Sequence, residues 1–225
     1  MNVPLAAVSF DAMGTLVTLA PPAPRLQRSL ARRLGVTVDL ARCESGMRAE
    51  MRHYRAHCTG ARDAATLAAL RLECACLLAD ALALDVPGPE LLPALTDAIA
   101  FRAYEDAEPA LAALAASGLA LAVVANWDVS LHDVLARLGL ARHLAVVVTA
   151  AEVGVAKPGA RPFQVALERL GVDPAACVHV GDDPATDVAG AHAAGLRALL
   201  LDRSGRIPGS LADLGALAGR LQEAA

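Results

Sequence analysis

Five short apolar runs along the chain have the composition of strands that are buried on both faces. They contain no Asp, Glu, Lys or Arg and lie at residues 5–10, 119–125, 144–149, 177–180 and 198–201. Such continuous runs are typical of parallel strands, because helices cover a parallel sheet on both sides. Each of the later four runs follows a helix-like segment that ends at or near a glycine: 109–117, 129–138, 161–170 and 185–194. This alternation predicts an α/β fold with a doubly wound parallel sheet.

A large insertion separates the first predicted strand from the second. More than a hundred residues lie between them, far beyond the length of one crossover helix. The intervening chain shows helical periodicity and no convincing strand, with amphipathic segments at 25–34, 39–58, 62–84 and 89–101. We therefore expect a core domain built from residues 1–17 and 102–225, interrupted by an all-helical domain of residues 18–101.

Composition narrows the classes of partner. The 225 residues are 56% hydrophobic and carry a net charge of −4, which gives no electrostatic footprint for a nucleic acid or an anionic membrane. The five cysteines form no zinc-like pair of pairs, and the amino-terminal residues lack the cationic start of a signal peptide. These features predict a cytoplasmic protein that binds neither nucleic acid nor a membrane. They say nothing of its oligomeric state.

Lys157 is unusual in this chain. The other 19 of the 20 basic residues are arginine, so the coding bias of the sequence strongly favours arginine. A lysine supplies a compact point charge that a planar guanidinium does not. Its presence at a single position therefore indicates a chemical role for Lys157.

Polar residues follow four of the predicted strands. In a parallel α/β sheet the carboxyl ends of the strands meet at one edge, which is where ligands bind. Several carboxylates brought together there need a cation, and oxygen ligands suit a hard ion such as Mg²⁺. The residues concerned are Asp11; Asn126 and Trp127; Lys157; and Asp182, Asp183 and Asp187.

These motifs resemble those of the haloacid dehalogenase-like hydrolase superfamily, in the subfamily whose helical cap is inserted after the first strand. The sequence Asp-Ala-Met-Gly-Thr at residues 11–15 stands at the family's nucleophile motif, and Lys157-Pro158 at its lysine motif. The run Gly-Asp-Asp-Pro-Ala-Thr-Asp at residues 181–187 is similar to its metal-binding motif. The likeness extends from Ser9 to Asp202 and implies a Rossmann-like core with Mg²⁺ as the cofactor.

The resemblance implies covalent catalysis of phosphate ester hydrolysis on a small phosphorylated metabolite. Asp11 would attack phosphorus to form an aspartyl-phosphate, with Lys157 neutralising both the nucleophile and the transferring oxygens. The metal ligands would be the Asp11 carboxylate, the Met13 carbonyl and Asp182, with Asp187 orienting the ligand shell. Thr15, Asn126, Trp127 and Lys157 would contact the substrate.

Two of these assignments remain open on the sequence alone. Asp183 is either a further metal ligand or the N-cap of the helix that follows it. Trp127 either lines the substrate pocket or covers the edge of the sheet.

Two positions depart from the phosphatase branch of this family. That branch has a second aspartate two residues after the nucleophile, which serves as general acid and then general base, whereas this chain has Met13. General acid–base catalysis contributes about 10²–10⁴ in rate, so its loss predicts weak turnover. After the second strand the family has a serine or threonine that donates to the phosphate, whereas this chain has Ala125.

Two other functions remain open on the sequence alone. The L-2-haloacid dehalogenase branch also lacks the second aspartate, but it uses no metal and replaces the Gly-Asp motif, which this chain keeps at residues 181–182. The third hypothesis is a catalytically impaired protein that binds phosphate or a partner.

Overall fold

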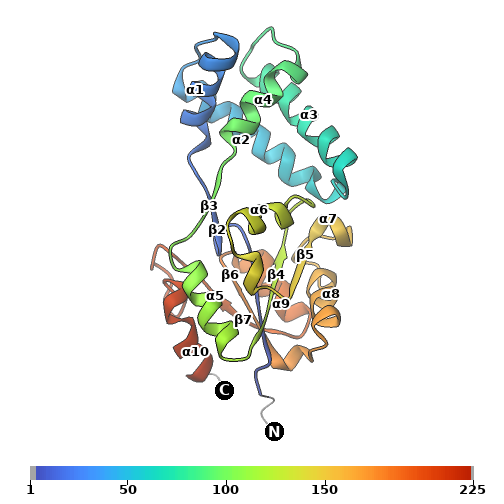
Figure 1. Cartoon of the computed structure of the whole chain (residues 1–225), viewed down its shortest axis with the longest axis vertical. Helices are drawn as coiled ribbons and strands as arrows, with labels where there is room; N and C mark the ends of the chain where they lie inside the picture. The colour runs from blue at the N-terminus through green and yellow to red at the C-terminus, as the bar shows by residue number, and fades with distance from the viewer. Residues whose placement is uncertain (1–3, 224–225) are drawn as a thin grey trace. The chain divides into compact units, whose positions relative to one another are not determined.

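The structure is a computed structural model that describes residues 4–223. It divides into two compact units, drawn in Figure 1: a core unit of residues up to Thr18 and from Ala103 onward, and a helical unit of Leu19–Arg102. The chain passes from one unit to the other through β2 (Val17–Leu19) and returns through β3 (Phe101–Ala103), and these two strands pair with each other. The expected boundaries, after residues 17 and 101, lie one residue from these. Residues 1–3 and 224–225 of the expected core lie outside the described residues.

A five-stranded parallel sheet forms the centre of the core unit. Its order is β5-β4-β1-β6-β7, and each neighbouring pair of strands is parallel. This confirms the predicted fold class. The strands are β1 (Ala7–Phe10), β4 (Ala120–Ala125), β5 (Val146–Thr149), β6 (Cys177–Gly181) and β7 (Arg197–Leu200).

Helices cover both faces of this sheet (Figure 1). The crossovers through α5 (Ala107–Ala116) and α6 (Leu131–Arg137) move along the sheet in one direction, from β1 to β4 and then β5. The crossovers through α8 (Arg161–Leu170) and α9 (Ala189–Ala193) move in the opposite direction. Because parallel crossovers are right-handed, the two pairs of helices lie on opposite faces. Phe163, Ala166 and Leu167 of α8 pack on the strands in one buried cluster with Ala191.

Two shorter helices complete the core unit, α7 (Ala150–Val153) and α10 (Leu217–Glu223). The helix predicted at 185–194 is present in two parts, a π-helical turn at Pro184–Val188 followed by α9. Asp183 caps the π-helical turn, since its Oδ1 accepts hydrogen bonds from the backbone of Ala185 and Thr186.

The helical unit packs four helices around an apolar centre: α1 (Pro22–Leu34), α2 (Leu40–His57), α3 (Ala64–Ala81) and α4 (Gly88–Ala98). Polar caps fix where two of them begin. The Asp39 side chain accepts from the Arg42 backbone at 2.9 Å, and Asp63 forms a capping box with Thr66. Gly46 permits close packing of α2 on α3, because a Cβ there would lie 2.9 Å from Leu78 and Leu82.

The last predicted helix of this unit, 89–101, is wrong at its carboxyl end. The helix ends at Ala98, and Ile99 already has extended backbone angles. Phe101 lies in β3, which pairs with β2. This pairing gives the backbone hydrogen bonds that replace those of a longer helix. A three-residue strand is too short to show a period of its own, so the sequence pattern extended the helix through it.

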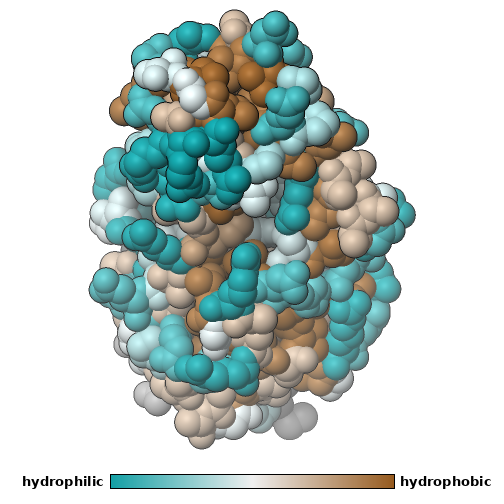
Figure 2. Space-filling model, turned by 45° about the horizontal axis from the view of Figure 1, so that its top comes forward, coloured by the Kyte–Doolittle hydropathy of each residue, from teal (hydrophilic) through white to brown (hydrophobic). Residues whose placement is uncertain are grey.

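Hydrophilic and hydrophobic residues are interspersed on the face shown in Figure 2. Within residues 4–223, none of the helices combines the length and the apolar character that crossing a bilayer requires.

Candidate active site

The candidate site lies where the direction of the crossovers reverses, at the carboxyl ends of β1 and β6. Asp11 directly follows β1, and Asp182 directly follows β6, the strand beside it. Asn126 follows β4, and Lys157 lies between α7 and α8 beyond β5. Such a reversal opens a crevice outside the strand ends. The fold therefore gathers at one edge four side chains that are up to 171 positions apart in the printed sequence.

The ammonium group of Lys157 sits at the centre of the site. Its Nζ donates to Oδ1 of Asp11 at 2.6 Å, to Oδ1 of Asp187 at 2.6 Å and to the Val124 carbonyl at 2.7 Å. The side chain of Lys157 is 1% exposed and that of Asp187 is 2% exposed. Because an ammonium has three donors, all of its hydrogen-bonding capacity is used inside the protein.

The electrostatics of this cluster follow from burial and charge pairing. Burial raises the pKa of Asp11 to about 7; the Lys157 ammonium opposes this shift and the Asp187 carboxylate adds to it. Burial acts to raise the pKa of Asp187, but the nearby His179 ring and the charge of Lys157 outweigh burial and hold this pKa below the usual range. Burial lowers the pKa of Lys157, but the two carboxylates raise it more, so the ammonium stays protonated.

Asp11, Asp182 and Asp187 form a group of carboxylates with one oxygen each inside a 4.8 Å span. Among residues 4–223 it is the only cluster of three or more His, Cys, Asp or Glu with such spacing. One ammonium cannot balance three carboxylates, and the donors are all oxygen, so the group fits a hard divalent cation such as Mg²⁺. A cation beside these oxygens would also favour the ionised form of Asp11.

Gly14 allows the carboxylate of Asp182 to approach the loop after β1. Gly14 has φ of +91°, and a Cβ at this position would lie 2.2 Å from Oδ2 of Asp182. Only glycine accommodates both the left-handed backbone and this close approach. The Met13 carbonyl directly precedes Gly14, and its assignment as a metal ligand stays a prediction.

Asn126, a predicted substrate contact, forms hydrogen bonds with the backbone of Lys157. Its Oδ1 accepts from the Lys157 backbone N–H at 2.7 Å, and its Nδ2 donates to the Lys157 carbonyl at 3.0 Å. The amide therefore fixes the backbone of the lysine. Whether its remaining N–H also reaches a substrate stays a prediction.

The other predicted substrate contacts have little solvent exposure. Trp127 is 5% exposed, which favours the alternative in which it covers the sheet edge. Thr15 is fully buried, and its hydroxyl has no hydrogen-bond partner among the described residues. Its side chain does not face solvent in this conformation of the loop. Ala125 is 2% exposed and offers no hydroxyl to a phosphate.

Asp183 and Asp187 have different tasks. Asp183 lies outside the carboxylate group and caps the π-helical turn, as its two backbone hydrogen bonds show. Asp187 belongs to the carboxylate group, and its Oδ2 accepts from the Asp183 backbone N–H at 3.0 Å. This contact and the Lys157 ammonium fix both oxygens of Asp187.

A buried polar pair, Ser9 and His179, lies behind the site and has no predicted role. Ser9 and His179 occupy paired positions on β1 and β6, and Ser9 Oγ lies 2.9 Å from His179 Nδ1. Nε2 of His179 lies 3.6 Å from Oδ1 of Asp187. Burial lowers the pKa of His179 to about 4, so the ring is neutral near pH 7. Two polar residues inside otherwise apolar strands were the available signal.

Comparisons with known proteins identify the family of the chain. A sequence profile of the haloacid dehalogenase-like hydrolases matches residues 5–195. The phosphoserine phosphatase of Thermus thermophilus is 44% identical over 101 residues, 44% of this chain and 41% of that protein. The mouse haloacid dehalogenase-like hydrolase domain-containing protein 3 is 36% identical over 134 residues, 60% of this chain and 53% of that protein. The matched part of the chain thus spans about half or less of these relatives.

Two solved structures share the fold over nearly their full length. The HAD phosphatase from Thermococcus onnurineus has a TM-score of 0.66 and 28% identity, covering 96% of this chain and 98% of that one. The 2-haloacid dehalogenase from Pseudomonas syringae pv. Tomato DC3000 has a TM-score of 0.67 and 27% identity, covering 98% and 100%. Since their names give two different reactions, the fold alone does not select the reaction. The profile match spans most of the sequence, and the chain belongs to the haloacid dehalogenase-like hydrolase family.

Proposed function

We propose that the protein is a Mg²⁺-dependent phosphatase that hydrolyses small phosphorylated metabolites through an aspartyl-phosphate on Asp11. The observation that carries this proposal is the grouping of Asp11, Asp182 and Asp187, with one oxygen each within 4.8 Å, where Lys157 pairs with Asp11 and Asp187. The proposed compartment is the cytoplasm.

The first chemical step is an in-line attack on phosphorus. Lys157 holds Oδ1 of Asp11, so Oδ2 is the oxygen that bonds to phosphorus. The bond to the ester oxygen breaks, and the leaving group departs with that electron pair as an alkoxide or phenolate, which takes any proton it needs from solvent water. Water then attacks the phosphorus of the aspartyl-phosphate and gives up a proton to solvent, which releases phosphate and regenerates the Asp11 carboxylate. When bound, Mg²⁺ supplies positive charge that reduces repulsion between the nucleophile and the phosphate.

Lys157 supplies the charge that this chain itself brings to the step. It pairs with the nucleophile in the resting site, and the same charge stabilises the transferring oxygens. Asn126 holds its backbone in place. Asp187 shares the ammonium, which fixes Nζ between two carboxylates.

The proposed enzyme transfers protons poorly. Met13 has no titratable group to protonate a leaving alcohol or to activate water, so substrates whose leaving group needs no proton should react best. Ala125 removes one hydroxyl donor to the phosphate as well. We therefore expect weak turnover of alkyl phosphates.

A 2-haloacid dehalogenase is the second candidate function. Met13 is compatible with it, and a solved dehalogenase of 27% identity shares the fold. In that reaction a carboxylate oxygen of Asp11 would displace halide from carbon, and water would hydrolyse the resulting ester. Asp182 favours the phosphatase, since a third carboxylate beside Asp11 would repel an anionic substrate in the absence of a cation.

The two functions separate in one set of assays. We expect the protein to hydrolyse p-nitrophenyl phosphate with Mg²⁺, to lose this activity in EDTA, and to lose it in Asp11→Asn. The matched control is Asp173→Asn, which changes an exposed turn carboxylate. Halide release from 2-haloacids that persists in EDTA would support the dehalogenase instead. Mass spectrometry of rapidly quenched reactions should show a phosphorylated Asp11, and an unmodified Asp11 without any turnover would indicate a binding protein.

A further inference from the structure

We propose that Arg203 is a positioning residue that fixes the loop after the nucleophile, and with it the oxygen cluster that would bind Mg²⁺. The inference rests on the proposed function and adds a residue that no sequence motif marks. Arg203 follows β7, at the far edge of the sheet from β5.

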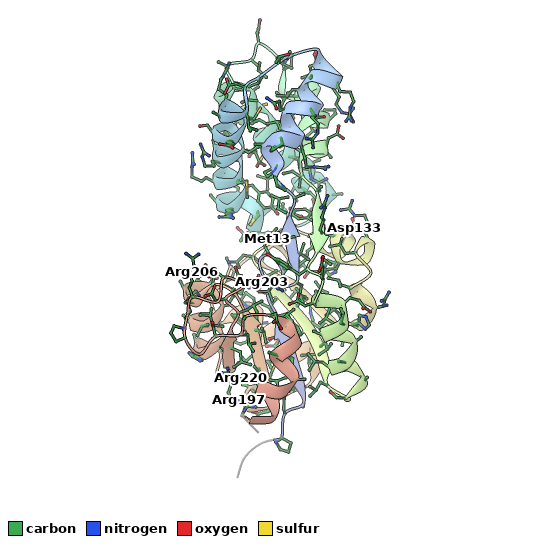
Figure 3. All side chains as sticks on the ribbon, turned by 90° about the vertical axis from the view of Figure 1, so that its left-hand side faces the viewer. Met13, Asp133, Arg197, Arg203, Arg206 and Arg220 are labelled. Carbon is green, nitrogen blue, oxygen red and sulfur yellow. The ribbon has the colours of Figure 1, made fainter. Side chains whose placement is uncertain are left out.

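The guanidinium of Arg203 donates to two successive carbonyls of the nucleophile loop. Its Nε donates to the Gly14 carbonyl at 3.2 Å, and its Nη2 donates to the Thr15 carbonyl at 2.7 Å. Figure 3 labels Arg203 and Met13, the residue that precedes Gly14, at the same end of the core unit. The loop thus has an anchor in addition to its covalent connection to β1.

The same guanidinium is held by the segment that follows β3. Nη1 and Nη2 donate to the two carboxylate oxygens of Asp106 at 2.9 and 3.0 Å, and Cζ lies 3.7 Å from the centre of the Tyr104 ring. Asp106 also accepts from the Leu214 backbone at 2.8 Å. With its side chain 21% exposed, Arg203 is held between these partners and has little freedom to move.

Any shift of the Gly14–Thr15 peptide would move the atoms that contact the Asp182 carboxylate. The Gly14 carbonyl belongs to the residue whose Cα lies against the Asp182 carboxylate. The preceding residues, Asp11 and Met13, supply two of the predicted metal ligands. If the Gly14–Thr15 backbone shifted, Asp182 would lose its fixed distance from Asp11.

Arginine is suited to this position and lysine is not. A planar fork bonds two carbonyls and a carboxylate at once, whereas an ammonium has three donors around one point. In a lysine variant at least one of the two carbonyls would lose its partner, and the loop would gain alternative conformations.

The test measures Mg²⁺ binding without turnover. Isothermal titration of the full chain with MgCl₂ would compare wild type, Arg203→Lys and Asp106→Asn, with Arg206→Lys as the control. Arg206 is exposed, and the contact of its guanidinium is with Ser204. We expect the Mg²⁺ dissociation constant to rise about tenfold or more in Arg203→Lys, as for other residues that orient metal ligands. It should rise less in Asp106→Asn and stay unchanged in Arg206→Lys.

Thermal unfolding and steady-state kinetics distinguish positioning from a general loss of stability. If Arg203→Lys and Asp106→Asn lower the unfolding temperature but leave the Mg²⁺ dissociation constant and kcat at saturating Mg²⁺ unchanged, the inference is overturned while the proposed function stands. If folded wild-type protein binds no Mg²⁺, the proposed function fails and the inference fails with it. Asp106→Asn keeps the assay decisive if Arg203→Lys does not fold, because it loosens the anchor without removing it.

Discussion

The side-chain amide of Asn126 and the backbone of Lys157 form a closed pair of hydrogen bonds, with lengths of 2.7 and 3.0 Å. The two residues come from loops that follow neighbouring strands, β4 and β5. The amide therefore determines where the lysine backbone stands, and the side chain then extends to Asp11 and Asp187. Asn126 thus affects the proposed reaction through Lys157.

Removing this amide should displace the lysine. We expect Asn126→Ala to lower kcat for p-nitrophenyl phosphate at least tenfold and to destabilise the protein by about 1–3 kcal/mol, because two backbone groups lose their partner. Asn126→Asp keeps an acceptor for the Lys157 N–H and should be less impaired in stability. Urea unfolding and steady-state kinetics measure both effects. An Asn126→Ala variant with wild-type kinetics would show that Lys157 is placed without the amide.

Substitution of Gly14 should be unfavourable for two separable reasons: its left-handed backbone conformation and the close approach of Asp182. Gly118 provides a matched control, since its φ is +88° but a Cβ there would meet no atom within 4 Å. We expect Gly118→Ala to lose about 1–2 kcal/mol of stability, the cost of alanine in a left-handed conformation. Gly14→Ala should lose more, because the new Cβ would also displace the Asp182 carboxylate. Only Gly14→Ala should weaken Mg²⁺ binding. Equal Mg²⁺ affinity in the two variants would contradict the role given to the Asp182 contact.

Placing an aspartate at position 13 should restore the missing proton transfer. We expect Met13→Asp to accelerate hydrolysis of an alkyl phosphate by about 10²–10⁴, the usual contribution of a general acid–base group. Its effect on p-nitrophenyl phosphate should be much smaller, because that leaving group needs little protonation. The wild-type protein should already prefer p-nitrophenyl phosphate. Equal wild-type rates on the two substrates would contradict the proposed absence of acid catalysis.

The burial of Glu50 predicts that the stability of the helical unit depends on pH. It is 5% exposed on α2, and burial raises the pKa of its carboxyl above the usual 4.5, against the opposing effect of a hydrogen bond from the Cys74 thiol. The folded state therefore binds this proton more tightly than the unfolded state. The resulting stability is complete below pH 4.5 and is lost as pH rises through the folded pKa.

We therefore expect Glu50→Gln to raise the unfolding temperature relative to wild type at pH 8 but much less at pH 4. Differential scanning calorimetry of the full chain from pH 4 to pH 8 measures these unfolding temperatures. Glu44→Gln, on an exposed position of the same helix, should show a difference from wild type that does not grow with pH. A Glu50→Gln curve parallel to wild type would mean that the carboxyl does not titrate in this range.

The sheet and its ligand edge were predictable because their signals are local. Strands buried on both faces are apolar throughout, so β1, β4 and β6 stood out in the sequence. The carboxyl ends of parallel strands lie at one edge of the sheet. This was enough to predict that Asp11 and Asp182 lie close together, without knowing where their side chains point. The predicted strand at 144–149 began early because Leu144, although apolar, follows a 3₁₀ turn at Ala141–His143.

The remaining features depend on side-chain directions that no periodicity encodes. Arg203 meets Gly14 across 189 positions of the sequence, and Ser9 meets His179 across 170. Asn126 was visible as a polar residue at a strand end, but whether its amide turned to a ligand or to the neighbouring loop depended on the path of the loop. β2 and β3, with three residues each, were too short to show alternation.

The position of β1 in the middle of the sheet has a consequence for how the chain folds. Its two neighbours, β4 and β6, begin at Ala120 and Cys177, so this amino-terminal strand can form only pairs of high contact order. Such non-local pairing is slow. During synthesis, one hydrogen-bonding edge of β1 stays unpaired until β6 has left the ribosome, because the paired residues Ser9 and His179 lie 170 positions apart. The nascent chain is therefore most exposed to misassembly just before β6 emerges.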